Sequence, residues 1–187
     1  MLPFSEPMNK TNDMKIETQR LILREFEDAD FEQVFLMDSD PEVMKYLGKP
    51  VINVDESKEA IKMIQKQYEE NGVGRLAVIE KESDLMIGWS GLKLLKQPIN
   101  GHVNTLDLGY RFIPEFWGKG YAIEAARASL NYGFNELDAD AIYAYADSGN
   151  TGSNYILKKL GFKNTEEFED SGVKCLWYEL KREKYFQ

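Results

Sequence analysis

The sequence predicts a mixed α/β fold with a mostly antiparallel sheet. Runs with the period-two alternation of strands and runs with helical spacing alternate along the chain, without repeats or low-complexity tracts. Two pairs of strand-like runs are joined by short polar turns, as in antiparallel hairpins. A strand, a glycine-rich turn and a helix fill residues 106–134, and the other elements are arranged around this segment.

Composition indicates one globular domain. The 187 residues can bury a sizeable core, and 43% hydrophobic with 12% aromatic residues is typical of a folded chain. Residues 1–13 are polar and contain two prolines, so we expect them to be a disordered extension. Residues 14–187 then form the domain, and Met14 is a candidate alternative start.

Charge and cysteine content exclude several classes of protein. Lys and Arg number 23 against 32 Asp and Glu, and the net charge of −9 argues against binding nucleic acid or an anionic membrane. An amine substrate would not be repelled. The chain has one cysteine, Cys175, so a disulfide framework and a cysteine-rich metal site are excluded. Cys175 lies in an apolar run. Because the sequence shows neither a membrane-length apolar run nor a signal-peptide core, we expect a cytoplasmic protein. We also expect a monomer or a homodimer.

The first half of the chain predicts one strand followed by three helices. The strand lies in residues 16–26, where apolar and polar residues alternate around Leu21 and Leu23. Asp28 and Asp30 open the first helix. Residues 41–48 form a second, short helix, and residues 55–68 form a third with apolar residues at helical spacing.

The second half predicts two hairpins around the central segment. Residues 75–80 and 86–95 form the first hairpin, and a loop then leads to the central strand at 106–112. The helix after the glycine turn shows apolar residues at every fourth position, from Ala122 to Phe134. The remaining elements are a strand at 141–146, a helix at 151–160, and strands at 162–168 and 173–181.

The glycine turn has the composition of an anion site. The first turn of a helix leaves backbone N–H groups unpaired, and the helix dipole adds partial positive charge there. Gly118 and Gly120 let an anion approach the backbone without a Cβ in the way, and Lys119 adds a cation. The alternative is an ordinary turn before a surface helix.

Five segments carry a family resemblance: IETQRLILREF from Ile16, DPEVMKYLG from Asp40, IGWSGL from Ile87, LGYRFIPEFWGKGYAIEAA from Leu108, and NTGSNYILKKLGF from Asn150. In this order and at these separations they resemble the GNAT N-acetyltransferases, and within them the ribosomal-protein N-terminal acetyltransferases. The resemblance covers nearly the whole chain. It implies the GNAT fold, in which the central strands of the sheet splay apart. Trp117 stands where the family's turn pattern usually has Gln or Arg.

The resemblance also implies acetyl-CoA as the cofactor. In such enzymes the backbone of the glycine turn holds the pyrophosphate, and the preceding strand pairs with the pantetheine arm through main-chain groups. Asn150 matches an asparagine that contacts the cofactor, with a helix N-cap as its alternative role. The implied cofactor-binding residues are Tyr110, Arg111, Phe112, Gly118, Lys119, Gly120, Tyr121, Ala122, Ile123 and Asn150.

The implied reaction is direct attack of a primary amine on the acetyl thioester in a ternary complex. The leaving thiolate needs a proton donor. The common family tyrosine is replaced by Leu157, and the resembling branch uses a serine three residues after the asparagine, which is Ser153. Capping of the helix is the alternative role for Ser153, and Tyr155 is a weaker donor candidate.

The general base has several candidates. Asp107 on the central strand matches a position that is often acidic in this branch, and we predict it as the catalytic carboxylate. Glu124, in the first turn of the glycine-turn helix, is an alternative base. A carboxylate there also stabilises the helix through its dipole, so its presence does not require a catalytic role. His102, Asp55 and Glu56 are further candidates near the expected cleft.

Other functional classes fit less well. A Rossmann unit would need a third glycine and a shorter connection than residues 113–117, and a phosphate loop would need Ser or Thr in place of Gly120. A catalytically silent module that binds coenzyme A is the non-enzymatic alternative. The acceptor amine is left open between a protein N-terminus and a small molecule.

Overall fold

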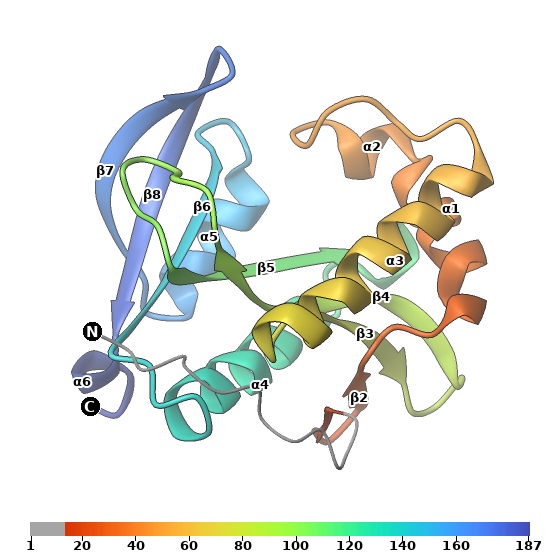
Figure 1. Cartoon of the computed structure of the whole chain (residues 1–187), viewed down its shortest axis with the longest axis horizontal. Helices are drawn as coiled ribbons and strands as arrows, with labels where there is room; N and C mark the ends of the chain where they lie inside the picture. Colours follow the sequence, from red (N-terminus) through yellow and green to blue (C-terminus); the bar gives the residue numbers. More distant parts are fainter. Residues whose placement is uncertain (1–13) are drawn as a thin grey trace.

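The computed structural model describes residues 14–187 and contains one eight-stranded sheet in the order β1-β2-β3-β4-β5-β6-β8-β7 (Figure 1). All neighbouring strands are antiparallel except β5 and β6, which are parallel. The predicted class, mixed α/β with a mostly antiparallel sheet flanked by helices, is therefore confirmed. The disorder predicted for residues 1–13 lies outside the described residues.

The single strand predicted at residues 16–26 was wrong, because this segment is a hairpin. Thr18 makes the turn: its N–H donates to the main-chain oxygen of Leu21 over 2.9 Å, and its Oγ1 accepts from the N–H of Leu21 over 3.0 Å. Alternation continues on both sides of the turn, so the period-two pattern does not show it. The elements of the first half are β1 Lys15–Glu17, β2 Leu21–Arg24, η1 Asp28–Asp30, α1 Phe31–Asp38, α2 Pro41–Met44 and α3 Val54–Asn71.

The second half follows the prediction closely, with two short helices, η2 and α6, that the sequence did not indicate. The strands are β3 Arg75–Glu80, β4 Leu85–Leu95, β5 Thr105–Phe112, β6 Ala141–Asp147, β7 Lys163–Asp170 and β8 Val173–Lys181. The helices are η2 Pro114–Phe116, α4 Tyr121–Asn135, α5 Thr151–Lys159 and α6 Arg182–Tyr185.

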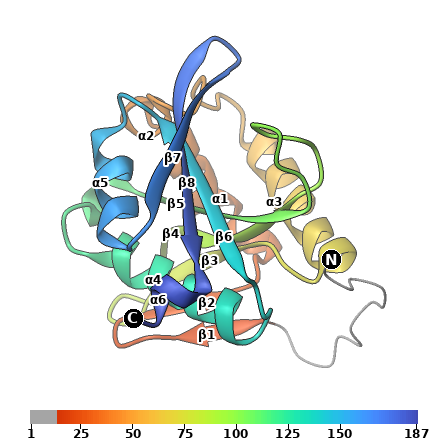
Figure 2. The same cartoon turned by 90° about the vertical axis from the view of Figure 1, so that its left-hand side faces the viewer.

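Helices cover both faces of the sheet, and Figure 2 shows α5 and α3 on opposite sides of the strands. On one face, Leu106 and Leu108 of β5 pack with Leu130 of α4 and Leu157 of α5. On the other face, residues of α1 and α3 pack on β3 and β4 in a cluster of Phe26, Val34, Ile61, Ala77, Ile79 and Met86. We call these the α4 face and the α3 face.

The sheet splits between its two parallel strands. β5 pairs with β4 along its whole length, whereas β5 and β6 share a single register position, Asp107 with Tyr143. β6 instead pairs with β8 from Ala141 to Asp147. Beyond Asp107 the two strands therefore diverge, as expected for splayed central strands, and the edge of β5 from Leu108 to Phe112 has no partner strand.

Candidate active site

The unpaired edge of β5 offers main-chain groups to a ligand. The N–H of Ile113 donates to the main-chain oxygen of Ile87 on β4 over 3.0 Å, so Ile113 directs its main-chain groups towards β4. Because successive residues of a strand direct their main-chain groups to opposite edges, Tyr110 and Phe112 direct theirs towards β6, and Arg111 directs its own towards β4. Trp117 Nε1 donates to the main-chain oxygen of Phe112 over 2.7 Å. An extended ligand can therefore pair with both main-chain groups of Tyr110 and with the N–H of Phe112.

Arg111 takes part in the structure mainly through its side chain. Its Nη1 lies 2.6 Å from Asp38 Oδ1 at the end of α1, and its guanidinium lies 5.2 Å from the ring centroid of Trp89. Its main-chain groups face β4, with Trp89 as the register partner. Of the three residues predicted to pair with the pantetheine arm, Arg111 is therefore the one whose main chain already faces a strand.

The glycine turn leaves a series of amides unpaired. Gly118 has φ +73° and Gly120, the N-cap of α4, has φ +83°, values that residues with a side chain rarely adopt. Among the described residues, no group accepts a hydrogen bond from the main-chain N–H groups of residues 118–123. The helix dipole adds partial positive charge there. These predicted residues therefore form a cradle that fits a pyrophosphate.

Side chains of the turn attach it to its surroundings. The hydroxyl of Tyr121 bonds to Glu80, and Nζ of Lys119 lies 5.0 Å from the ring centroid of Phe116. Ile123 packs against the core of the α4 face. These side chains thus hold the shape of the turn, and its main-chain amides are the groups left free for a ligand.

Glu124 in the first turn of α4 is occupied by hydrogen bonds. Its carboxylate accepts from Thr18 Oγ1 over 2.7 Å, from the N–H of Arg20 over 2.9 Å and from Arg20 Nε over 2.7 Å. Burial raises the pKa of this carboxylate, but these hydrogen bonds outweigh burial and hold the pKa below its usual range. Glu124 therefore fits a structural role better than that of a base. The partners Thr18 and Arg20 were not predicted, since nothing in a strand pattern indicates a partner about a hundred residues away.

Asn150, Ser153 and Tyr110 come together beside the open edge of β5. Asn150 is the N-cap of α5, and its Oδ1 accepts from the N–H of Ser153 over 3.0 Å. The hydroxyl of Tyr110 donates to the main-chain oxygen of Ser153 over 3.1 Å and lies 3.2 Å from Ser153 Oγ. Burial raises the pKa of Tyr110, so its hydroxyl keeps its proton at neutral pH. Capping leaves Nδ2 of Asn150 available to a ligand.

Asn154 holds α5 in this position, a role that the sequence did not predict. The side chain is buried; its Nδ2 donates to the main-chain oxygens of Asp147, over 3.0 Å, and Ser148, over 3.3 Å. Its Oδ1 accepts from the hydroxyl of Tyr178 over 2.9 Å. Tyr155, the weaker donor candidate, is 61% exposed and interacts with Lys159.

Asp107 lies on the α3 face, where β5 and β6 begin to diverge. It is buried and forms an ion pair with Arg75, whose Nη1 also donates to the main-chain oxygen of Asp107 over 2.5 Å. Gly109 makes room for this arginine, because a Cβ there would lie 2.6 Å from Arg75 Nη2. Burial raises the pKa of Asp107, although Arg75 and Lys93 act in the opposite direction. The catalytic role of Asp107 stays a prediction.

The other candidate bases have structural partners. His102 stacks on Trp177, with ring centroids 4.6 Å apart, and lies near Tyr143. Glu56 completes a capping box at the start of α3, and Asp55 pairs with Lys58. In the described part of the chain, none of these three side chains contacts the glycine turn.

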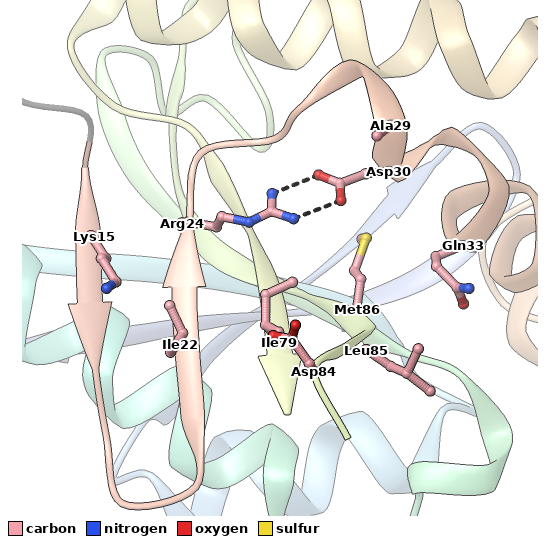
Figure 3. Close-up of a pocket in the computed structure, with 10 residues that line it drawn as sticks. All are labelled: Lys15, Ile22, Arg24, Ala29, Asp30, Gln33, Ile79, Asp84, Leu85 and Met86. Atoms are coloured by element: carbon pink, nitrogen blue, oxygen red, sulfur yellow. Dashed lines mark hydrogen bonds and ion pairs between the residues drawn. The ribbon is translucent and has the colours of Figure 1, made fainter. Parts of the chain in front are cut away.

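A pocket of about 460 Å³ lies elsewhere, where β2, β3 and β4 meet the start of α1 (Figure 3). Its apolar lining includes Ile22, Ile79, Leu85 and Met86. Arg24 donates to both carboxylate oxygens of Asp30, over 2.7 and 2.8 Å, so these two charges satisfy one another. The pocket shares no residue with the glycine turn, the split or α5.

The geometry defines the class of ligand. A free strand edge leads to a cradle of unpaired amides at a helix N-terminus, which suits an extended ligand that ends in phosphates. Among residues 14–187, no cluster of three or more His, Cys, Asp or Glu side chains is arranged to hold a metal ion. The same part of the chain contains no helix long and apolar enough to span a bilayer.

Known proteins share this sequence and architecture. A model of the acetyltransferase (GNAT) domain matches residues 20–163. The uncharacterized N-acetyltransferase p20 of Bacillus licheniformis is 35% identical over 147 residues, which cover 78% of this chain and 80% of that protein. Spermidine N(1)-acetyltransferase of Escherichia coli (strain K12) is 29% identical over 143 residues, which cover 75% of this chain and 71% of that protein. A solved GNAT-family acetyltransferase from Bacillus anthracis has a TM-score of 0.76 and 28% identity, covering 91% of this chain and 99% of the other.

The chain therefore belongs to the GNAT family of acetyltransferases. It is an N-acetyltransferase, and its cofactor is acetyl-CoA, the acyl donor that the family uses.

Proposed function

We propose that this chain moves an acetyl group from acetyl-CoA to a primary amine by direct attack while both are bound. The observation that carries the proposal is the split between β5 and β6, which leads directly to the glycine turn. Bound acetyl-CoA would supply the activated thioester. The main chain of residues 118–123 would hold its pyrophosphate, Tyr110 and Phe112 would pair with its pantetheine arm, and Asn150 would contribute Nδ2.

The residues beside the split supply two chemical functions in this proposal. A main-chain N–H on the open edge of β5 would donate to the negative charge that develops on the carbonyl oxygen. Ser153 would give a proton to the leaving thiolate. Tyr110, whose hydroxyl lies 3.2 Å from Ser153 Oγ, would hold this serine in place. The sequence predicted a role for the main chain of Tyr110 but not for its side chain.

The acceptor amine would approach from the α3 face. The α4 face beside the split is filled by the core cluster that includes Leu108, Leu130 and Leu157. On the α3 face, Asp107 lies buried at the split, paired with Arg75, and Tyr143 is directly opposite it on β6. Because amines with pKa values of about 8 to 10.4 are mostly protonated at pH 7, a base is needed. Asp107 would accept this proton, directly or through water.

The charge of the chain favours a cationic acceptor. A net charge of −9 attracts amines that carry further positive charges. The similar protein from Escherichia coli is named for spermidine, a small amine of this kind. We therefore propose a small cationic amine as the acceptor, and a protein N-terminal amine, which the ribosomal-protein branch would imply, as the alternative. A cytoplasmic location is part of the same proposal.

Two measurements on one sample test the proposal. Calorimetric titration with acetyl-CoA measures binding, and release of free thiol is then followed over a panel of polyamines, aminoglycosides, amino acids and peptides. We expect binding, with thiol release accelerated by the cationic small amines. Acceleration by peptides alone would select the alternative acceptor. Absence of acetyl-CoA binding would contradict the assignment of the turn and of the split.

A further inference from the structure

Arg20 lies at the turn of the β1–β2 hairpin and contacts the glycine turn from outside. Its Nη1 donates to the main-chain oxygen of Lys119 over 2.9 Å. Its Nε and Nη2 each lie 2.7 Å from Glu124 Oε2. The guanidinium carbon lies 4.3 Å from the ring centroid of Tyr121. One side chain thus fixes the residue between the two glycines and two residues of the first helical turn.

The charge of Glu124 gives these contacts a functional consequence. A carboxylate in the first turn of α4 interacts favourably with the helix dipole, but it also lies where a phosphate would bind. Left unpaired, it would repel the pyrophosphate. Arg20 neutralises this carboxylate, and its Nη2 lies 3.5 Å from the position of a Cβ on Gly120. A positive charge is therefore held directly against the turn.

We propose that Arg20 is a positioning residue for acetyl-CoA: it holds the pyrophosphate turn in shape, cancels the charge of Glu124, and couples the β1–β2 hairpin to cofactor binding. The inference rests on the proposed pyrophosphate site. It also predicts reciprocity, because a bound cofactor that stabilises the turn must stabilise the hairpin that is bonded to it.

Stability of the fold alone does not account for this arrangement. The side chains of Arg20 and Glu124 are 42% and 19% exposed, so solvent screens the pair and its contribution to folding stability is modest. The same hairpin carries a second ion pair, between Arg24 and Asp30, which is more buried and faces the pocket in Figure 3. Arg24 is therefore a matched control: it has the same side chain and belongs to the same hairpin, but it has no described contact with the turn.

The test compares R20Q, R24Q, E124Q and the double variant R20Q/E124Q by calorimetric titration with acetyl-CoA. We expect R20Q to weaken binding about tenfold, because the turn loses a bond and gains an unpaired negative charge. The double variant should recover part of this loss, and R24Q should bind like the wild type. Turnover with acetyl-pantetheine, a thioester without the pyrophosphate, should be unchanged in R20Q.

Hydrogen exchange supplies a readout independent of turnover. Acetyl-CoA should slow amide exchange in residues 15–24 of the wild type and lose this effect in R20Q. Wild-type affinity in R20Q, or an equal loss in R24Q, would overturn the role of Arg20 while leaving the cofactor site intact. A wild-type chain that binds no acetyl-CoA would instead overturn the proposed function, and this inference with it.

Discussion

Neighbouring side chains hold Ser153 in its position beside the split. Asn150 caps its N–H, Tyr110 lies within hydrogen-bond distance of its hydroxyl, and Asn154 in the next position ties the helix to the end of β6. A helix N-cap and a proton donor are therefore compatible roles for this short segment. The cap is made by the side chain of Asn150, which leaves the hydroxyl of Ser153 free of that task.

The variant S153A should separate these roles. If Ser153 protonates the leaving thiolate, kcat should fall by about a hundredfold, within the usual range for a general acid, while the affinity for acetyl-CoA stays unchanged. Steady-state thiol release and calorimetry measure the two quantities. S148A, at the exposed residue just after β6, is the control and should behave like the wild type. Unchanged kcat in S153A would remove Ser153 from the mechanism.

Glu124 should make folding stability depend on acidic pH. Its hydrogen bonds with Thr18 and Arg20 hold its folded pKa below the value of about 4.3 expected in the unfolded chain. The resulting stability is fully present above about pH 4.3 and is lost as the pH falls through the lower folded pKa. The free energy of unfolding of the wild type should therefore exceed that of E124Q at pH 6, and the difference should shrink towards pH 3. Urea unfolding at both pH values measures it, and a difference independent of pH would contradict the ionised pairing.

At the scale of elements, the sequence predicted what local patterns encode. Period-two alternation located β3 to β8, and helical spacing located α1 to α5, because these signals follow from burial of one face of each element. The tight turn at Thr18 escaped, since alternation runs through it and the turn depends on a local side-chain bond. The contacts of Arg20 with Glu124 and of Arg75 with Asp107 escaped as well. They join elements far apart in the sequence, and only the strand order brings them together.

Some parts of the candidate site were predictable from the sequence, and others were not. The turn from Gly118 to Gly120 shows in the sequence because its backbone conformation needs glycine, and both glycines have positive φ. The partner of Ser153 was not predictable, because a hydroxyl contact with Tyr110 depends on how far β5 and α5 lie apart. Likewise, the sequence named Asp107 but gave no sign of the arginine that pairs with it.

The role of the glycine turn can be tested with a matched control, because a second glycine outside the turn has a similar φ angle. Gly120 has φ +83° at the start of α4, and Gly72 has φ +66° at the end of α3. A valine at either position adopts a left-handed conformation at a cost of at least about 1–2 kcal/mol. G120V and G72V should therefore lower thermal stability by similar amounts, but only G120V should weaken acetyl-CoA binding, by tenfold or more. Equal affinities in the two variants would show that the turn does not approach the cofactor.

At the scale of the whole molecule, the sheet is two units joined at one point. β1 to β5 form one continuous ladder, β6 to β8 form another, and a single register position links β5 to β6. The core of the α4 face bridges the two units with residues of α4 and α5. A gap in the ladder costs main-chain hydrogen bonds that folding would otherwise make. A bound cofactor that pairs with the edge of β5 and with α5 would restore part of this pairing.

This architecture predicts strong stabilisation by the cofactor. At a concentration about one hundred times Kd, binding to the folded state alone adds about 2.7 kcal/mol to the free energy of unfolding. For a chain of this length each kcal/mol raises Tm by about 2–4 °C, so acetyl-CoA should raise Tm by about 5–11 °C. Calorimetric melting with matched hydrogen exchange measures both the shift and its location. Slower exchange should appear on both sides of the split, at residues 110–112 and 150–154, because the proposed cofactor position touches both units. Protection confined to residues 118–123 would mean that the phosphates bind while the arm does not enter the split, and the assignment of Tyr110 and Phe112 would then be wrong.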